Sequence, residues 1–414
     1  MDRRTTGLAM IVIGILGLLA YPLYAGFVWS NTTAQGPGSP WNPGAMGPWS
    51  GQGQTVPPAP VTLDEAKTTA QQYLVSLNNP NLAIKEFLDV AGSHDFEHFV
   101  NQVAADVTDP EMNVTVGERR RAKQRIDALE PGAKDPVKEI AKIAADPKKD
   151  FYIDALGSGS DYSAYLENLG LPALNVGYGD EGDSGGVYHS RYDTFEHHSK
   201  FVDPGFVYDG VLAKTVGRMV IRLSDAELPV QRAGNFAEAI GRYLKEVEKL
   251  AKDKREAAAN QAKLLDDHSF QLSADPTKTS GVPIALKQVP KFDLSLLDKA
   301  VARLTKSAKA YDNAFAGNAS RLTAKSRARL QALMQTIDQT LAPDVGLAGR
   351  PWYKNQIYAP GRFTGYGVKT LPGVREAIED ERFEDVSRYV KIIADALNAY
   401  SARLDQATAV LKGH

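Results

Sequence analysis

His189 has the most distinctive chemical surroundings in the sequence. It follows Tyr188 in the run Gly-Val-Tyr-His-Ser, within the part of the chain that is dense in both glycine and polar residues. An imidazole in such a loop either binds a metal ion or forms structural hydrogen bonds. The chain has no cysteine and only seven histidines, so any other strong ligands must be histidine, aspartate or glutamate. The chemistry at His189 therefore depends on which of these residues lie near it.

A second pattern that could bind a metal ion begins at His94. Together with Glu97 and His98 it reproduces the H-x-x-E-H spacing of inverted zincins, in which two histidines on one helix face bind zinc and the glutamate acts as a base. The alternative is an ordinary helix start, because a five-residue pattern often occurs by chance and the apolar residues that follow resemble a buried helix face. No third ligand is indicated, and the sequence favours the ordinary helix.

A glycine-rich loop lies upstream of His189, at residues 157–161. The apolar segment 151–156 predicts a strand before it, residues 162–169 predict a short helix, and residues 171–177 predict a buried strand. This order is typical of an α/β unit, in which glycines after a strand bring the backbone close to a ligand at the carboxyl edge of the sheet. A phosphate-binding loop would need a lysine here, and there is none.

An acidic loop spans residues 177–186 and contains Asp180, Glu181 and Asp183. Its carboxylates either bind a hard cation through oxygen ligands or are solvated, and solvation is the more common state of such a loop. His197 and His198 follow on what we expect to be the surface.

The first sixty residues predict a membrane anchor and a tether. No charge interrupts the apolar stretch from Gly7 to Trp29, and Arg3 and Arg4 precede it. We therefore expect residues 1–30 to form a transmembrane helix with a cytoplasmic N-terminus, so that the bulk of the chain is extracytoplasmic. The alternative is a cleaved secretory signal, which exports the rest of the chain equally. Residues 31–60, rich in Gly, Pro and Ser, predict a flexible tether.

The remaining chain predicts a small helical module, an α/β region and a helical bundle. A capping box at Thr62 and Glu65 starts a module that we assign to residues 61–91. The α/β region follows at 92–230. Apolar residues then recur at helical spacing in 236–265, 297–311, 330–341 and 383–404, so we expect a helical bundle over residues 231–414.

Overall charge gives no reason to expect a nucleic-acid partner. The 414 residues carry a formal net charge of -2, and we find no local basic patch. With 43% hydrophobic and 24% charged residues, the chain has enough apolar material for two or three globular units.

Several of these motifs resemble one known family, the membrane-anchored zinc exopeptidases of the glutamate carboxypeptidase and transferrin receptor group. The resemblance begins at about Gly92 and continues to the end of the chain. Its motifs are Gly157-Ser-Gly-Ser-Asp161, Tyr188-His189-Ser190-x-Tyr192-x-Thr-Phe195, Phe201-x-Asp203-Pro204-x-Phe206 and Arg350-Pro-Trp-Tyr-x-x-x-Ile357-Tyr-Ala-Pro360. The implied fold is an α/β remnant of a zinc-peptidase domain followed by an α-helical dimerisation bundle, here fused to an unrelated N-terminal membrane segment.

The resemblance implies roles for five residues. It implies that His189 is a zinc ligand and that Tyr188 lines the site and helps hold the tetrahedral intermediate. Gly159 would lie near the catalytic water, and Ser160 would stand at the start of the substrate cleft. Tyr366 would hold the terminal carboxylate of a peptide substrate. A lysine that precedes this tyrosine in the carboxypeptidases is Gly365 here, which puts glutamate specificity in doubt.

The metal-binding core of that family is missing upstream. The chain has neither an H-x-D motif followed by a Glu-Glu pair nor the further aspartate expected before Gly92, since Asp89 lies too close to it in what looks like a helix. One histidine cannot assemble a pair of zinc ions or provide the general base. We therefore assign no catalytic residue and expect zinc at less than full occupancy.

Two functions remain open. The first is a membrane-anchored relative of zinc-dependent carboxypeptidases, which cleave C-terminal residues from peptides, with doubtful activity in this chain. The second is a non-catalytic, transferrin receptor-like binding or dimerisation protein. The resemblance implies a homodimer formed through the C-terminal helices in both cases.

Overall fold

The computed structural model describes residues 86–180, 189–275, 277 and 281–413. The chain divides into two units, residues 1–83 and 84–414, and every described residue belongs to the second. The predicted transmembrane helix at 1–30, the tether at 31–60 and residues 61–85 of the small module lie outside the described residues. Within the described ranges, none of the helices combines the length and the apolar character that crossing a bilayer requires.

A two-stranded antiparallel sheet forms the centre of the α/β region. Strand β1, Glu86–Gly92, pairs with β2, Leu174–Asp180, with Val90 opposite Val176. Leu88 and Val90 are buried whereas Asp89 between them is exposed, which is the period-two alternation of a half-buried strand. The prediction of a helical module is therefore wrong for residues 86–91, and so is the helical setting expected for Asp89.

The predicted strand, helix and strand after Asp150 are observed in altered form. Residues 151–156 are extended but join β1 through a single parallel bridge, in which the Gly92 amide donates to the Asp154 carbonyl at 2.8 Å. The predicted helix is one π-helical turn, Ala164–Asn168, and the predicted strand at 171–177 begins only at Leu174.

Four helices and one short turn of helix accompany this sheet. They are α3 (Glu97–Ala104), α4 (Val116–Asp127), α5 (Asp135–Ala145), α6 (Phe195–His197) and α7 (Val207–Asp225). A capping box starts α4, because Thr115 accepts from the Glu118 amide and Glu118 accepts from the Thr115 amide. A small apolar core that includes Phe99, Val103, Ile153 and Met219 holds the region together.

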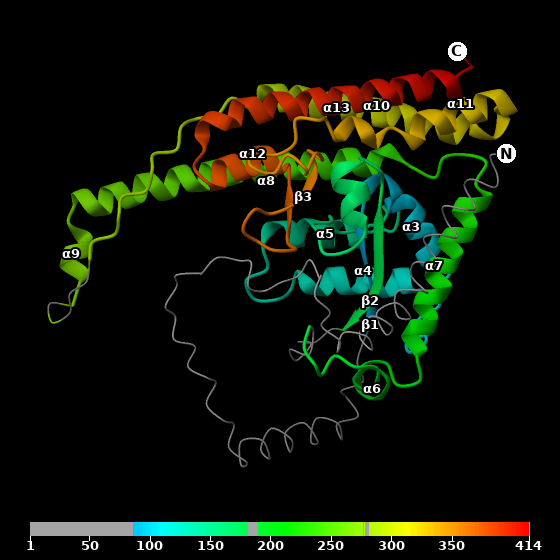
Figure 1. The fold of residues 1–414 in the computed structure, drawn as a ribbon, viewed down its shortest axis with the longest axis horizontal. Helices are drawn as coiled ribbons and strands as arrows, with labels where there is room; N and C mark the ends of the chain where they lie inside the picture. Colours follow the sequence, from blue (N-terminus) through cyan, green and yellow to red (C-terminus); the bar gives the residue numbers. More distant parts are fainter. Residues whose placement is uncertain (1–85, 181–188, 276, 278–280, 414) are drawn as a thin grey trace, which may run out of the picture. The chain divides into compact units, whose positions relative to one another are not determined.

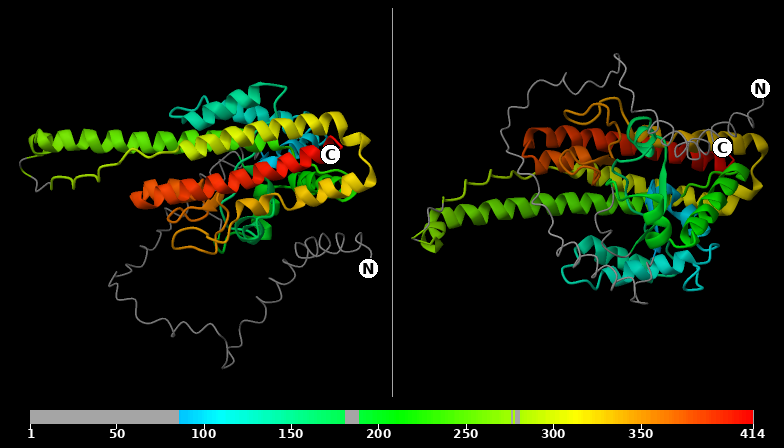
Figure 2. Two further views of the ribbon diagram at one scale, coloured as in Figure 1. Left: turned by 90° about the horizontal axis from the view of Figure 1, so that it is seen from above. Right: turned by 60° about the horizontal axis from the view of Figure 1, so that its bottom comes forward.

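The C-terminal half is mostly helical, as predicted. It contains α8 (Ala233–Asp266), α9 (Ser269–Ser273), α10 (Ser295–Asn318), α11 (Ala324–Gln335), α12 (Pro372–Glu379) and α13 (Phe383–Leu411), with the short strands β3 (Tyr358–Pro360) and β4 (Val368–Thr370). Helices α8, α10 and α13 lie side by side (Figures 1 and 2). Their apolar stripes form one large core, which also includes Leu156 and Leu166 of the preceding region.

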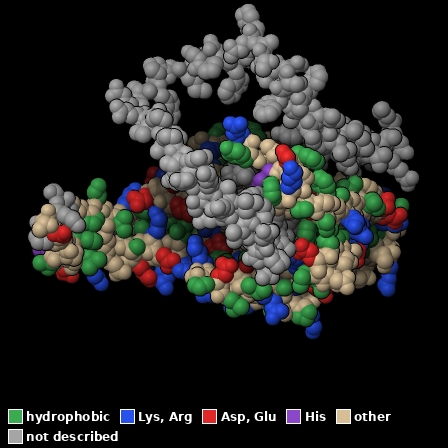
Figure 3. Space-filling model, turned by 90° about the horizontal axis from the view of Figure 1, so that it is seen from below, with side chains coloured by type: hydrophobic (Ala, Val, Ile, Leu, Met, Phe, Trp, Pro, Cys, Tyr) green, Lys and Arg blue, Asp and Glu red, His purple; other side chains and the backbone are tan. Residues whose placement is uncertain are grey.

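The far end of α8 carries α9 beyond the neighbouring helices of this unit (Figures 1 and 2). Large apolar side chains are exposed on this arm and on the segment that returns from it, namely Leu264, Leu272, Val282, Ile284 and Leu286. On the face drawn in Figure 3, acidic, basic and apolar side chains are interspersed along the described surface.

Candidate substrate-facing site

The glycine loop after residue 156 lies against the turn that carries Tyr366. The Ser158 amide donates to the Tyr366 carbonyl at 3.2 Å. A Cβ added to Gly159 would lie 3.0 Å from the Tyr366 ring, and one added to Gly157 would lie 2.0 Å from the Tyr366 carbonyl oxygen. Two segments about 200 residues apart in sequence, both predicted to face a substrate, therefore meet in the fold. We call this contact between residues 157–160 and Tyr366 the glycine–tyrosine platform.

Backbone geometry explains why glycine occupies these positions. Gly159 has φ of +118° and Gly365 has φ of +60°, which are conformations that side chains with a Cβ rarely adopt. The turn between β3 and β4 is closed by the Gly361 amide, which donates to the Gly367 carbonyl at 2.8 Å. Tyr366 is 57% exposed at the tip of this turn, and Ser160 is exposed on the loop opposite. Both side chains are therefore accessible to a ligand.

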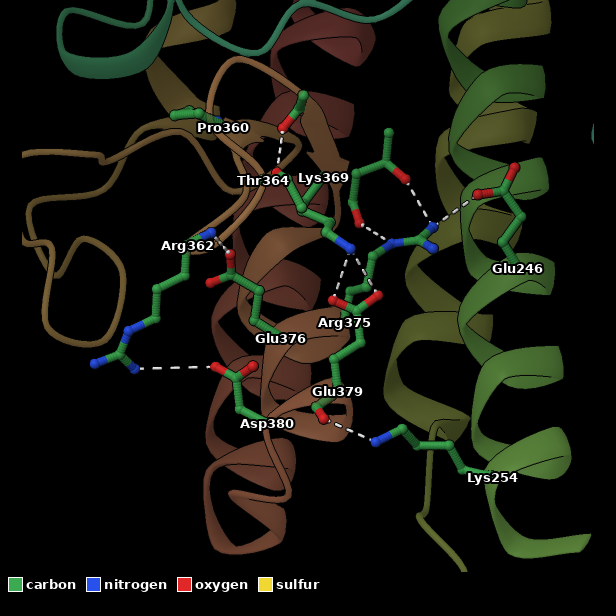
Figure 4. Close-up of polar contacts among 12 residues, drawn as sticks. Glu246, Lys254, Pro360, Arg362, Thr364, Lys369, Arg375, Glu376, Glu379 and Asp380 are labelled. Carbon is green, nitrogen blue, oxygen red and sulfur yellow. Dashed lines mark hydrogen bonds and ion pairs between the residues drawn. The ribbon is translucent and has the colours of Figure 1, made fainter. Parts of the chain in front are cut away.

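A buried carboxylate fixes the start of this turn. Glu376 lies on α12 and is only 3% exposed. Its two carboxylate oxygens accept hydrogen bonds from the Arg350 guanidinium, at 2.9 and 2.8 Å. The same carboxylate accepts from the Arg362 amide at 2.8 Å (Figure 4). Arg350 also donates to the Pro360 carbonyl at 2.7 Å. Both carboxylate oxygens accept from one guanidinium nitrogen, Nη2 of Arg350. Hydrogen bonds between charged groups are strong, so α12 positions the turn that presents Tyr366.

Two further ion pairs fix the other side of the turn. Arg375 of α12 and Glu246 of α8 point toward each other and lie 2.7 Å apart (Figure 4). Lys369 of β4 contacts Glu379 at 2.9 Å. These pairs attach β4 and α12 to the long helix α8, which extends the support of Tyr366 into the helical bundle.

His189 lies outside this platform, at the first residue after the gap at 181–188. It is exposed and has φ of +58°. Tyr188 and the acidic residues Glu181 and Asp183 fall within the gap, so their predicted roles lie outside the described residues. Among the residues that the structure describes, no group of three potential ligands includes His189. Because residues 181–188 lie outside the described residues, the zinc site predicted at His189 stays a prediction. No chemical step is assigned to zinc.

A different set of potential ligands occurs at the start of α7. His198, Asp203 and Asp209 have ligand atoms within 4.8 Å of one another. However, both oxygens of Asp203 already accept backbone amides, from Val207 at 3.0 Å and Asp209 at 2.9 Å. His198 pairs with Asp209 at 3.0 Å. Asp203 therefore acts as a cap for the N-terminal end of α7. His198 was predicted to be a surface residue without a functional role.

The possible zinc pair of His94 and His98 is not formed. His94 lies in a 3-10 turn before α3, and both of its ring nitrogens are engaged, with Glu97 at 3.2 Å and the Tyr243 hydroxyl at 2.5 Å. His98 instead contacts Asp150, at 3.0 Å. The metal-binding interpretation of this pattern is therefore wrong, because the two imidazoles serve separate hydrogen-bond networks.

The network at His94 is buried and uncharged at neutral pH. Burial lowers the pKa of His94 to about 3 and raises the pKa of Glu97 to about 8. Glu97 also accepts a hydrogen bond from the Ile153 amide at 3.0 Å. The Tyr243 hydroxyl forms a second hydrogen bond, with the Tyr152 hydroxyl at 3.0 Å. Sequence reasoning missed Tyr152 and Tyr243, since nothing in their local pattern distinguishes them from core tyrosines.

Comparison with known proteins gives this arrangement a context. The chain is 28% identical over 258 residues to "Probable glutamate carboxypeptidase LAMP1" of Arabidopsis thaliana. The aligned segment covers 62% of this chain and 32% of that protein. It is 24% identical over 256 residues to "Probable glutamate carboxypeptidase" of Arthroderma benhamiae, covering 59% and 29%. It is 29% identical over 122 residues to "Aminopeptidase NAALADL1" of Rattus norvegicus, covering 28% and 15%. The chain thus spans at most about a third of the length of these relatives.

A family match covers part of the C-terminal half. Residues 292–405 match the family described as transferrin receptor-like dimerisation domain. The matched region begins just before α10 and ends within α13. It therefore includes the β3–β4 turn, so that Tyr366 and the Glu376 anchor belong to the matched region. These findings support a relative of the peptidase family, as the sequence predicted.

Proposed function

We propose that this chain carries the substrate-facing and dimer-forming regions of a carboxypeptidase-like protein and does not hydrolyse peptides unaided. The observation that carries the proposal is the glycine–tyrosine platform, since residues 157–160 and Tyr366 are the two segments expected to meet a substrate and they lie in contact. The names of the relatives, glutamate carboxypeptidase and aminopeptidase, support a peptide substrate class.

The proposed roles of the platform residues differ. Tyr366 would receive the terminal carboxylate of a peptide through its exposed hydroxyl, while Gly159 and Ser160 would border the cleft. Tyr188 and His189 would complete the site as a substrate contact and a zinc ligand if another chain supplied the missing metal ligands. Because the sequence has no H-x-D motif followed by a Glu-Glu pair, the unaided chain is proposed to bind peptides without cleaving them.

Peptide binding tests this proposal. Fluorescence anisotropy would measure the affinity of the full chain for a labelled Ala-Ala-Phe peptide, for the same peptide with a C-terminal amide, and for both with Tyr366→Phe. We expect the free acid to bind more tightly than the amide, and Tyr366→Phe to remove most of that preference. Equal binding of acid and amide, or cleavage of the peptide by the purified chain, would contradict the proposal. Tyr192→Phe, at another exposed tyrosine, is the control.

The proposed assembly is a homodimer. Its support is the match of residues 292–405 to a dimerisation domain, together with the exposed apolar side chains on the α8–α9 arm, which a second copy of the chain would cover. Light scattering on the purified chain tests the assembly, and a monomer at micromolar concentration would contradict it.

Attachment to a membrane through residues 1–30 is part of the proposal. It rests on the uncharged apolar stretch from Gly7 to Trp29 and on Arg3 and Arg4 before it. Cell fractionation tests it: the full chain should stay with membranes in high salt and alkaline carbonate, and release by carbonate would contradict an integral anchor.

A further inference from the structure

A pocket separate from the platform opens between α5, α8 and β4. Its volume is about 300 Å³. Its wall includes the aromatic rings of Tyr152 and Tyr243 and the apolar side chains of Pro136, Ile140 and Val368. Ala155 and Thr370 also line it, and its charged lining residues are Arg242, Lys369, Arg375, Asp154 and Glu246. Apolar walls with a few polar groups are typical of small-molecule sites.

Most charges in this pocket are already neutralised. Arg375 pairs with Glu246 at 2.7 Å, Lys369 pairs with Glu379 at 2.9 Å, and Asp154 pairs with Arg120 at 2.7 Å. Both acidic residues of the lining, Asp154 and Glu246, are therefore paired with an arginine. An anionic ligand therefore meets no uncompensated negative charge among the described lining residues.

Arg242 is different, because it has no ion-pair partner among the described residues. Within the described part of the chain its guanidinium forms no ion pair or hydrogen bond, and it acts on the carboxyl groups of Glu97 and Glu139 only at longer range. It lies over the Tyr152 ring, 4.7 Å from the ring centre, in a cation–π contact that holds the side chain in place. The N–H donors of a held guanidinium match the two oxygens of a carboxylate. One positive charge is thus presented in a partly apolar pocket.

We propose that this pocket binds a small carboxylate with an apolar side chain, and that Arg242 is the anchor of the carboxylate. The apolar group would lie against Ile140 and Val368, and the carboxylate would face Arg242 beside Tyr152. This site is independent of the glycine–tyrosine platform, since neither Gly159 nor Tyr366 lines it.

Ligand-observed NMR on the full chain tests the proposal with N-acetyl-leucine and its neutral amide. The acid should bind and the amide should bind more weakly. Arg242→Gln should weaken binding of the acid roughly 10- to 100-fold, which corresponds to the loss of a hydrogen bond to a charged group. Arg242→Lys should weaken it less, because the charge remains while the paired donors are lost.

Three further variants distinguish binding in this pocket from binding on the platform and from a general effect of charge. Lys245→Gln, at an exposed position on the same helix, should leave binding unchanged, whereas Ile140→Trp should reduce it by filling the pocket without altering charge. Tyr366→Ala removes the hydroxyl of the platform, so that binding lost through this variant is binding on the platform and not in this pocket. No binding of N-acetyl-leucine by the unaltered chain, equal binding of acid and amide, or unaltered binding by a folded Arg242→Gln chain would overturn the proposal. If only Tyr366→Ala abolished binding of N-acetyl-leucine, the carboxylate would bind on the platform, and this result would also overturn the proposal.

Discussion

Gly157 lies directly against the main chain of Tyr366, so closely that a Cβ on Gly157 would come within 2.0 Å of the Tyr366 carbonyl oxygen. The next residue, Ser158, donates its amide to the same oxygen. No side chain fits between these two strands of backbone. The contact connects the α/β region to the turn between β3 and β4, so both parts of the chain form the glycine–tyrosine platform.

Gly157→Ala should therefore destabilise the chain. The added methyl group must displace backbone atoms, and overpacking of this kind typically costs about 1–3 kcal/mol. Urea unfolding measures the change. Gly210→Ala is the matched control, because nothing lies within 4 Å of its added Cβ and alanine favours the helix. Equal stability of the two variants would show that the Gly157 contact is not formed.

Glu376→Ala should loosen the turn that carries Tyr366. It leaves Arg350 without its carboxylate, and breaking one partner of a buried ion pair costs about 3–5 kcal/mol. The amide of Arg362 loses its acceptor as well. Thermal unfolding measures the loss of stability, and limited proteolysis should reveal new cleavage at residues 361–367. Asp253→Ala, which breaks an exposed pair with Lys249, should change neither result. An uncleaved turn in Glu376→Ala would argue against this support.

Tyr243→Phe should destabilise the core around His94. The variant removes the hydroxyl that contacts the Nε2 atom of His94, and it leaves a buried ring nitrogen without a partner. Such a group costs about 1–3 kcal/mol. Tyr366→Phe, at an exposed hydroxyl, is the control for removing a tyrosine oxygen, and urea unfolding compares the two. If Tyr243→Phe is as stable as that control, the network contributes nothing to stability.

Stability should fall as the pH rises above neutrality. The pKa of Glu97 is raised by burial to about 8 from an ordinary 4.5, so the folded state holds this proton more tightly and unfolding releases it between these values. Burial raises the pKa of Glu167 to about 9, in the same direction. His94 acts oppositely: burial lowers its pKa to about 3 from 6.5, so its contribution is lost as the pH falls below 6.5.

Glu97→Gln tests this pH dependence, because the amide resembles the protonated acid. Between pH 6.5 and 8 the variant should lose stability less steeply than the unaltered chain, by up to about 1.4 kcal/mol per pH unit. Chemical unfolding at a series of pH values measures the slope. Glu139→Gln, at an exposed carboxylate, should keep the original slope. An unchanged slope in Glu97→Gln would mean that Glu97 is ionised in the folded state.

Leu272→Asp and Ile284→Asp should weaken the proposed dimer. Both side chains are more than 80% exposed, Leu272 on α9 and Ile284 on the segment that returns from the arm. Burying an aspartate there without a partner is unfavourable. Light scattering should show a shift toward monomer. Leu129→Asp, at an equally exposed position outside the helical region, should remain dimeric. Dimers of unchanged stability in both arm variants would place the interface elsewhere on the helices.

The sequence predicted the long helices well and the small sheet less well. Helices α8, α10 and α13 have long apolar stripes whose period alone indicates their positions. Strand β1 was predicted as helix, although Leu88 and Val90 flank the exposed Asp89 in strand alternation, because three such residues are too few to outweigh the helical pattern before them. The spacing of His94 and His98 indicated a shared helix face, whereas a 3-10 turn separates them.

Long-range partners account for most of what the sequence could not predict. The hydroxyl of Tyr243 contacts His94 across 149 positions, and no local pattern indicates such a pair. The roles of Gly159 and Tyr366 were implied only by a family resemblance, and no local pattern predicts that the two residues meet. The lack of an ion-pair partner for Arg242 among the described residues is visible only once the partners of the neighbouring arginine and lysine residues are known.

The zinc content of the purified, untagged full chain tests the central claim most directly, namely that this chain carries a substrate-facing platform without a complete metal centre. Elemental analysis after dialysis should find far less than two zinc ions per chain, and His189→Ala should change that amount little. Two tightly held zinc ions per chain, lost together on His189→Ala, would contradict this claim.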